Sequence, residues 1–123
     1  MLPIILSAPH GGRQPIPEAP VRRGVGVAQF TTGRDNNTGE LVERIAAKLE
    51  ERFGAKPFLI IALFERKYVD ANRPSASAYE SDQGKLYYES YHGTADCCSI
   101  FMGRGRESTL STAVRATVKP SCP

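Results

Sequence analysis

One short segment near the start of the chain places an imidazole beside residues that let a backbone come close to a ligand. Residues 7–12 read SAPHGG, so His10 stands next to two glycines. Glycine permits close approach of the backbone to a bound ion or substrate, and a neutral imidazole is a common metal ligand. A lone histidine in a loop is more often a surface or hydrogen-bonded residue than a metal ligand, because metal ligands are recognised in sets. His10 is therefore a candidate metal ligand that needs partners.

A second segment, residues 69–73 with the sequence VDANR, places an amide beside a guanidinium. Asn72 and Arg73 together could bind a carboxylate, since a planar guanidinium forms two parallel hydrogen bonds to such a group. An Asx turn followed by a solvated arginine explains the same residues. The segment predicts one of these two arrangements.

A strand, a helix and a second strand must position the two segments. Residues 4–6 form a short β-branched run, and residues 58–64 form a continuous apolar run typical of a strand buried on both faces. Between them, a helix is predicted from Thr38 to Phe53, capped by Asn37 with Glu40 and ended by Gly54, because apolar residues recur at three- and four-residue steps. Such a unit joins neighbouring parallel strands.

The carboxyl ends of parallel strands meet at one edge of a sheet, where ligands bind. We therefore expect His10 and Arg73 to lie in one crevice. Residues 13–36 are rich in proline and glycine and are predicted to form a long loop, a feature that is often functional in a small domain. Residues 77–92 predict a helix interrupted at Gly84.

Four segments, in order and spacing, resemble the N-formylglutamate amidohydrolase family over about residues 3–94. They read ILSAPHGGR, RDNNTGELVERIAAKLEERF, ERKYVDANRP and YYESYHG. VDANR is also similar to the VDLNR segment of zinc carboxypeptidases. The resemblance implies an α/β fold of the phosphorylase/hydrolase-like type, with a parallel or mixed sheet and flanking helices, incomplete in this chain.

The resemblance also implies a zinc-dependent hydrolase that cleaves the amide of an N-acyl amino acid. His10 would be the first metal ligand and Asp35 the second; Glu40 is a weaker match because helix capping would occupy it. Asp35 equally fits a simple favourable charge near the start of the helix. The expected partner is a small carboxylate-bearing substrate.

The resemblance assigns the substrate side of the site to four residues. Asn72 and Arg73 would hold the substrate carboxylate. Arg66 would polarise the scissile carbonyl, or would pair with Glu65 or Asp70. His92 matches the end of the tyrosine-rich segment, which favours a place in the substrate pocket or a structural role over metal ligation.

The chain departs from the family after about residue 95. In the family, a later segment supplies the remaining histidine ligand and the general base lies further along the chain; neither is visible in this sequence. His10 and His92 are its two histidines. We interpret residues 1–95 as the N-terminal part of an amidohydrolase-like domain and residues 96–123 as a divergent, weakly structured tail of a truncated or alternatively ended product. This predicts little activity, weak or absent zinc binding and self-association through an uncovered sheet. The alternative is a catalytically dead carboxylate-binding or interaction module.

Composition excludes several other classes of protein. The chain has 123 residues, 41% hydrophobic and 24% charged, which suits one small globular domain. A net charge of +3 with interspersed acids argues against nucleic-acid binding. The longest apolar run is too short to span a membrane, and no leader is evident, which predicts a cytoplasmic protein. The glycines of residues 23–28 do not follow the dinucleotide-binding pattern, and the three cysteines show no metal or disulfide spacing.

Overall fold

The computed structural model describes residues 1–103 and 118–120 of the chain. Its elements in order are β1 (Ile5–Ala8), α1 (Thr38–Phe53), β2 (Phe58–Ala62), α2 (Ser75–Ala78), α3 (Asp82–Gly103) and β3 (Val118–Pro120). The helix predicted between the two strands is confirmed at both ends. Each predicted strand is confirmed within two residues, the usual uncertainty of element boundaries.

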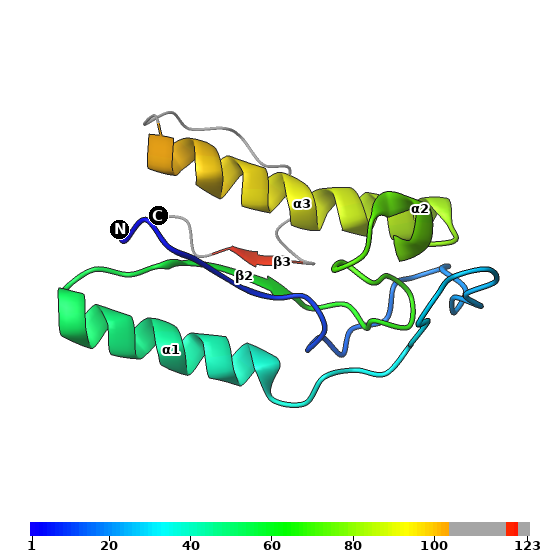
Figure 1. Ribbon diagram of the computed structural model, residues 1–123, viewed down its shortest axis with the longest axis horizontal. Helices are drawn as coiled ribbons and strands as arrows, with labels where there is room; N and C mark the ends of the chain where they lie inside the picture. Colours follow the sequence, from blue (N-terminus) through cyan, green and yellow to red (C-terminus); the bar gives the residue numbers. More distant parts are fainter. Residues whose placement is uncertain (104–117, 121–123) are drawn as a thin grey trace.

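The strands form one mixed sheet in the order β1-β2-β3. β1 and β2 are parallel, with Ile5 opposite Phe58 and Ala8 opposite Ile61, while β3 runs antiparallel to β2. Figure 1 shows α1 below this sheet and α3 above it. The predicted α/β class with flanking helices and parallel pairing of the first two strands is confirmed. The more specific phosphorylase/hydrolase-like assignment stays a prediction.

The main core lies between the sheet and α3. Phe58, Ile60 and Ala62 alternate along β2 with side chains on this face, and they cluster with Phe64 and Tyr91. The ring of Phe64 meets the edge of Tyr87 on α3 at a centroid distance of 5.8 Å. Alternation along a strand buried on both faces thus explains the continuous apolar run of the sequence.

The apolar stripe of α1 is less buried than its periodicity suggests. Ala46 is buried, but Leu41, Ile45 and Phe53 are 55%, 39% and 57% exposed. Among the described elements, α1 has its main contacts with β1 and β2, and much of its apolar stripe is not covered by them. The prediction that uncovered apolar surface causes self-association stays open to test.

The predicted capping box at the start of α1 is wrong. Asn37 has a left-handed backbone (φ 60°), and its side chain makes no cap hydrogen bond. A capping side chain requires an extended backbone at this position, so the left-handed Asn37 does not cap α1 with its side chain. At the other end the prediction is confirmed, because Gly54 has φ 67° and its N–H bonds to the carbonyl of Glu50.

The tyrosine-rich segment forms two helices. α2 and α3 replace the single interrupted helix predicted for residues 77–92, and Gly84 lies in the first turn of α3, where its N–H bonds to the Ser81 hydroxyl at 3.0 Å. α3 continues past Ala95 to Gly103, so the predicted boundary between residues 1–95 and 96–123 falls inside a helix. Residues 104–117 and 121–123, most of the predicted tail, lie outside the described residues.

Gly12 should be the glycine at which a methyl group is most damaging. It lies against the end of β2, where an added Cβ would be 2.3 Å from the carbonyl oxygen of Phe64. We expect Gly12→Ala to lower the free energy of unfolding by about 1–3 kcal/mol, because backbone atoms must move. Gly93→Ala is the control, since nothing lies within 4 Å of its Cβ and alanine favours a helix. Urea denaturation of both variants tests this; equal effects would contradict the contact at Gly12.

Candidate functional site

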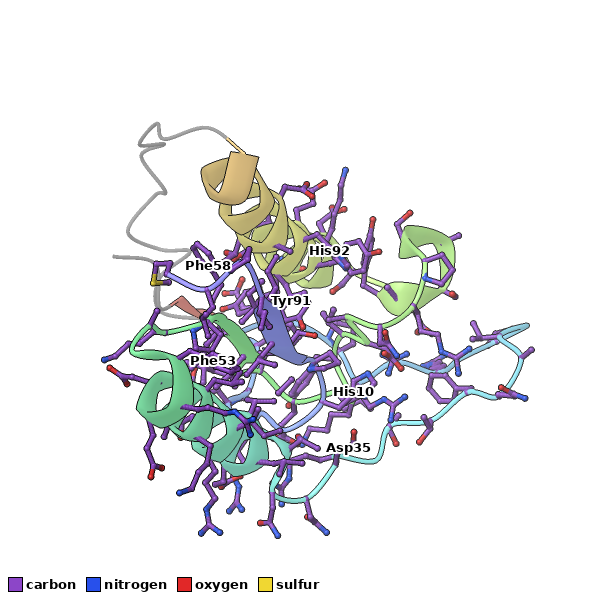
Figure 2. The ribbon with its side chains drawn as sticks, turned by 60° about the vertical axis from the view of Figure 1, so that its left-hand side comes forward. His10, Asp35, Phe53, Phe58, Tyr91 and His92 are labelled. Carbon is purple, nitrogen blue, oxygen red and sulfur yellow. The ribbon has the colours of Figure 1, made fainter. Side chains whose placement is uncertain are left out.

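His10 lies just beyond the carboxyl end of β1 with its two ring nitrogens facing two carboxylates. It is 6% exposed, and its Nε2 lies 2.7 Å from Oδ1 of Asp70. Its Nδ1 lies 3.4 Å from Oδ2 of Asp35, which is too long for a hydrogen bond of good geometry. The backbone fixes this arrangement, because the Asp35 N–H donates to the His10 carbonyl at 3.0 Å. Figure 2 shows His10 and Asp35 close together in this way.

Asp70 is the centre of the site, a role that was not predicted from the sequence. It is 1% exposed and accepts hydrogen bonds from His10, from Nε of Arg66 at 2.9 Å and from the N–H of Asn72 at 3.1 Å. Burial raises its pKa, but the hydrogen bonds from His10 and Arg66 favour the charged form, so the pKa lies below its usual value. Its place in the loop that follows β2, two residues before Asn72, was the signal that could have identified it.

Arg66 joins the two carboxylates that face His10. Besides its hydrogen bond to Asp70, its Nη1 lies 3.8 Å from Oδ1 of Asp35. Of the alternatives left by the sequence, pairing with Asp70 is what the structure contains, while Glu65 pairs with Lys67 at 2.9 Å. Arg66 therefore balances the negative charge around His10.

Arg73 also approaches the carboxylate of Asp70. Its Nε lies 3.8 Å from Oδ2 of Asp70. The expectation that His10 and Arg73 come together beyond the strand ends is confirmed to this extent, since both contact Asp70. Asn72 is exposed, and its side chain lines a cavity of about 230 Å³ between β1 and α3. Tyr88 fixes the backbone here by donating to the Arg73 carbonyl at 2.9 Å.

His92 belongs to this cavity and not to the imidazole–carboxylate group. Its Nε2 donates to the carbonyl of Ala71 at 3.1 Å, and its ring packs on Tyr88 with a centroid distance of 4.3 Å. It also lines the 230 Å³ cavity. Figure 2 shows His92 on α3, apart from His10 and Asp35. These contacts agree with the expected pocket or structural role.

A buried arginine that the sequence did not single out attaches the long loop to the site. Arg22 donates from Nη2 to the carbonyls of Thr31 at 3.0 Å and Arg66 at 2.6 Å. Its guanidinium stands over the Phe30 ring at 5.1 Å. Burial is the largest cause that lowers its pKa below the usual value. Arg22 lies in a stretch without periodicity, so no local pattern signals its burial.

Glu80, between α2 and α3, holds the tip of the same loop. Its carboxylate accepts from the backbone N–H of Arg23 at 2.8 Å and of Gly24 at 2.7 Å. These two hydrogen bonds, aided by the charges of Arg22 and Arg23, hold the pKa of Glu80 below its usual value. The Glu80 carboxylate is thus an anchor for a loop that is distant in sequence.

The Glu80 contact predicts a pH response confined to the loop tip. Because the pKa of Glu80 is lower in the folded state, its carboxylate stabilises the loop fully above the unfolded-state pKa, near 4.5. This stabilisation of the loop is lost as the pH falls through the lower folded-state pKa. We expect the amide proton shifts of Arg23 and Gly24 to titrate with a midpoint below 4.5. Two-dimensional NMR between pH 6 and pH 2.5 measures this. A Glu80→Gln variant should abolish the transition; a midpoint at or above 4.5 would contradict the two hydrogen bonds.

His10 and Asp35 fit a zinc ion in donor type and spacing. Ligand bonds of the usual length in a tetrahedral site place a nitrogen and an oxygen donor about 3.4 Å apart. The observed distance from Nδ1 of His10 to Oδ2 of Asp35 is 3.4 Å. Asp70 on Nε2 is the kind of partner that orients a ligating histidine. Within residues 1–103 and 118–120, however, no group of three or more histidine, cysteine or acidic side chains could hold a metal.

In the described part of the chain, no helix is long and apolar enough to cross a membrane. The loops that follow β1 and β2 bring His10, Arg66 and Arg73 into one connected polar group around Asp70. Comparisons of the chain with family models, curated proteins and solved structures find no match.

Proposed function

We propose that the chain carries part of the active site of a zinc-dependent amidohydrolase. The substrate would be a small N-acyl amino acid in the cytoplasm, with N-formylglutamate as the example that the motifs suggest. The observation that carries the proposal is the buried imidazole of His10, held at Nε2 by Asp70 and facing Asp35 through Nδ1. A neutral ring that donates to Asp70 presents its Nδ1 lone pair to a carboxylate, and a cation between the two would stabilise this pair.

His10 and Asp35 are the residues that would hold the metal, and Asp70 would orient His10. A bound zinc ion would supply polarisation of the substrate carbonyl and a water of lowered pKa. Arg66, which contacts both acids, would keep Asp35 and Asp70 ionised and in place. This role replaces direct polarisation of the carbonyl, because the Arg66 guanidinium is already engaged by the two carboxylates.

Arg73 and Asn72 would bind the carboxylate of the substrate. Both lie within three residues of Asp70, and the Asp70 carboxylate contacts both His10 and Arg73. A substrate held by Arg73 and Asn72 would therefore extend toward His10. A guanidinium edge matches a carboxylate in geometry, and Asn72 offers an exposed amide beside it. Binding of the substrate through its carboxylate would orient the scissile amide of the same molecule toward His10, and such orientation is a large part of catalysis.

The test combines metal content with turnover. Protein purified without chelator is analysed for zinc by elemental analysis and assayed with N-formylglutamate. Bound zinc and hydrolysis, both of which a partial site supports only weakly, should be lost together in His10→Ala, while Glu89→Ala, an exposed acid on α3, retains both. Hydrolysis that persists in His10→Ala would refute the proposed role of this residue.

A second candidate is a carboxylate-binding module without turnover. It is favoured by the described residues, which bring two metal donors together at His10 and Asp35 where catalytic zinc uses three protein ligands. In this case zinc is weakly bound and N-formylglutamate is bound but not cleaved.

Both candidates require Arg73 to hold a carboxylate. We expect Arg73→Ala to weaken the binding of N-formylglutamate by about 2–4 kcal/mol, because a charge-assisted and partly buried contact is lost. Lys85→Ala removes an exposed cation from α3 and is the control. Isothermal titration calorimetry measures both affinities; an unchanged affinity in Arg73→Ala would make the Asn-Arg pair structural.

A further inference from the structure

The guanidinium of Arg73 is already occupied by the chain itself. Its Nη1 donates to the carbonyl of Ala28 at 3.3 Å and its Nη2 to the carbonyl of Gln29 at 2.7 Å. Two oxygens on the two terminal nitrogens take the edge on which a carboxylate forms its paired hydrogen bonds. The remaining nitrogen, Nε, faces Asp70 at 3.8 Å. A carboxylate that pairs with both terminal nitrogens at this edge therefore competes with the carbonyls of residues 28 and 29.

Residues 22–31 form a loop that is fastened at its base and at its tip. At the base, Arg22 bonds to the carbonyl of Thr31, which closes the loop, and to the carbonyl of Arg66. At the tip, Glu80 accepts from the N–H groups of Arg23 and Gly24. In Figure 1 this loop, coloured light blue to cyan, lies at the same end of the molecule as α2. The Glu80 contact is exposed to solvent, so the tip can be released without disturbing the core.

The backbone at the Arg73 contact is not relaxed. Gln29 has φ 52°, in the left-handed region that side chains other than those of glycine, asparagine and aspartate avoid. Its carbonyl is the acceptor of the shorter Arg73 hydrogen bond. Contacts with Arg73 and Glu80 thus hold the loop in a conformation that its sequence does not favour locally.

We propose that the 22–31 loop is a lid whose Ala28 and Gln29 carbonyls act as an internal ligand of Arg73, and that a carboxylate-bearing molecule displaces them. The inference rests on the proposed carboxylate-binding role of Arg73 and not on zinc or on turnover. A ligand that binds only the open state has an apparent dissociation constant raised by the reciprocal of the open fraction. Opening the lid by other means should therefore tighten binding, and binding should open the lid.

The experiment uses glutarate as the carboxylate probe and Glu80→Ala to release the loop tip. Glu89→Ala removes an equivalent exposed carboxylate from α3 and is the matched control. We expect Glu80→Ala, but not Glu89→Ala, to speed hydrogen exchange of residues 22–31 and to bind glutarate about 3- to 10-fold more tightly. Saturating glutarate should raise exchange of residues 22–31 in the unmodified protein. Gly24→Ala is a second opening variant, since its Cβ would lie 2.1 Å from the Phe30 ring.

The outcomes separate the lid from the proposed enzyme. If N-formylglutamate is not hydrolysed but glutarate still opens the loop, the lid stands and the hydrolase fails. If Glu80→Ala and Gly24→Ala both open the loop while glutarate affinity stays unchanged, the lid is refuted. Glutarate binding that leaves exchange of residues 22–31 unchanged or slower also refutes it, as does a failure of glutarate to bind either form.

Discussion

Replacement of Asp70 by alanine should lower the free energy of unfolding by about 3–5 kcal/mol, the loss expected when one partner of a buried ionic network is removed. Asp70 is 1% exposed, and it accepts hydrogen bonds from His10, Arg66 and the N–H of Asn72. Without it, a buried imidazole and a largely buried guanidinium lose their common acceptor. Water cannot replace that acceptor without opening the loop between β2 and α2.

The measurement is urea unfolding of Asp70→Ala beside two comparison variants. Glu89→Ala, on the exposed side of α3, should change stability by less than about 0.5 kcal/mol. The loss of unfolding free energy in Asp70→Asn should lie between those of the other two variants. His10 and Asn72 approach Oδ1 of Asp70, while Arg66 and Arg73 approach Oδ2. An amide can offer an acceptor to one side only. A loss below about 1 kcal/mol in Asp70→Ala would mean that solvent satisfies the network.

The parts of the fold that sequence reasoning predicted well are those encoded by local patterns. Three- and four-residue spacing between Leu41 and Phe53 marks a helix whatever lies beneath it, and α1 has the predicted bounds. The apolar run at residues 58–64 marks β2, and the intervening helix makes parallel pairing with β1 the natural arrangement. The strand ends then bring His10 and Arg73 toward one place.

The centre of the site escaped prediction because its contacts join distant residues. His10 and Asp70 are separated by 60 positions, Arg22 and Arg66 by 44, and Glu80 and Gly24 by 56. No periodicity reports such pairs, and each residue has a plausible solvated alternative when it is considered alone. The error at Asn37 has the opposite origin, since a local capping motif was present but the backbone of Asn37 is left-handed where α1 begins.

The exposed stripe of α1 shows a third limit of sequence reasoning. Periodicity indicates which face of a helix is apolar, but the width of the surface beneath it depends on how many strands lie there. Leu41 and Phe53 remain largely exposed because, among the described elements, α1 has its main contacts with two strands. The same apolar stripe would be buried beneath a sheet with more strands.

At the proposed site, His10→Ala should weaken zinc binding about 70- to 900-fold. Structural zinc in peptides is bound by about 10–16 kcal/mol over four ligands, so one ligand contributes about 2.5–4 kcal/mol. Asp70→Asn should weaken it about 10- to 100-fold, because the ring loses the acceptor that fixes Nε2. His92→Ala should leave zinc affinity unchanged, since His92 bonds to the Ala71 carbonyl on the side of α3.

Competition with a chromophoric zinc chelator measures all three affinities, and circular dichroism checks that each variant is folded. The ordering of the variants is the informative result, because a partial site binds zinc weakly in absolute terms. Equal losses in His10→Ala and His92→Ala would mean that His92 leaves Ala71 and completes the ligand set. An unchanged affinity in His10→Ala would show that zinc binds elsewhere and would refute the proposed site at His10 and Asp35.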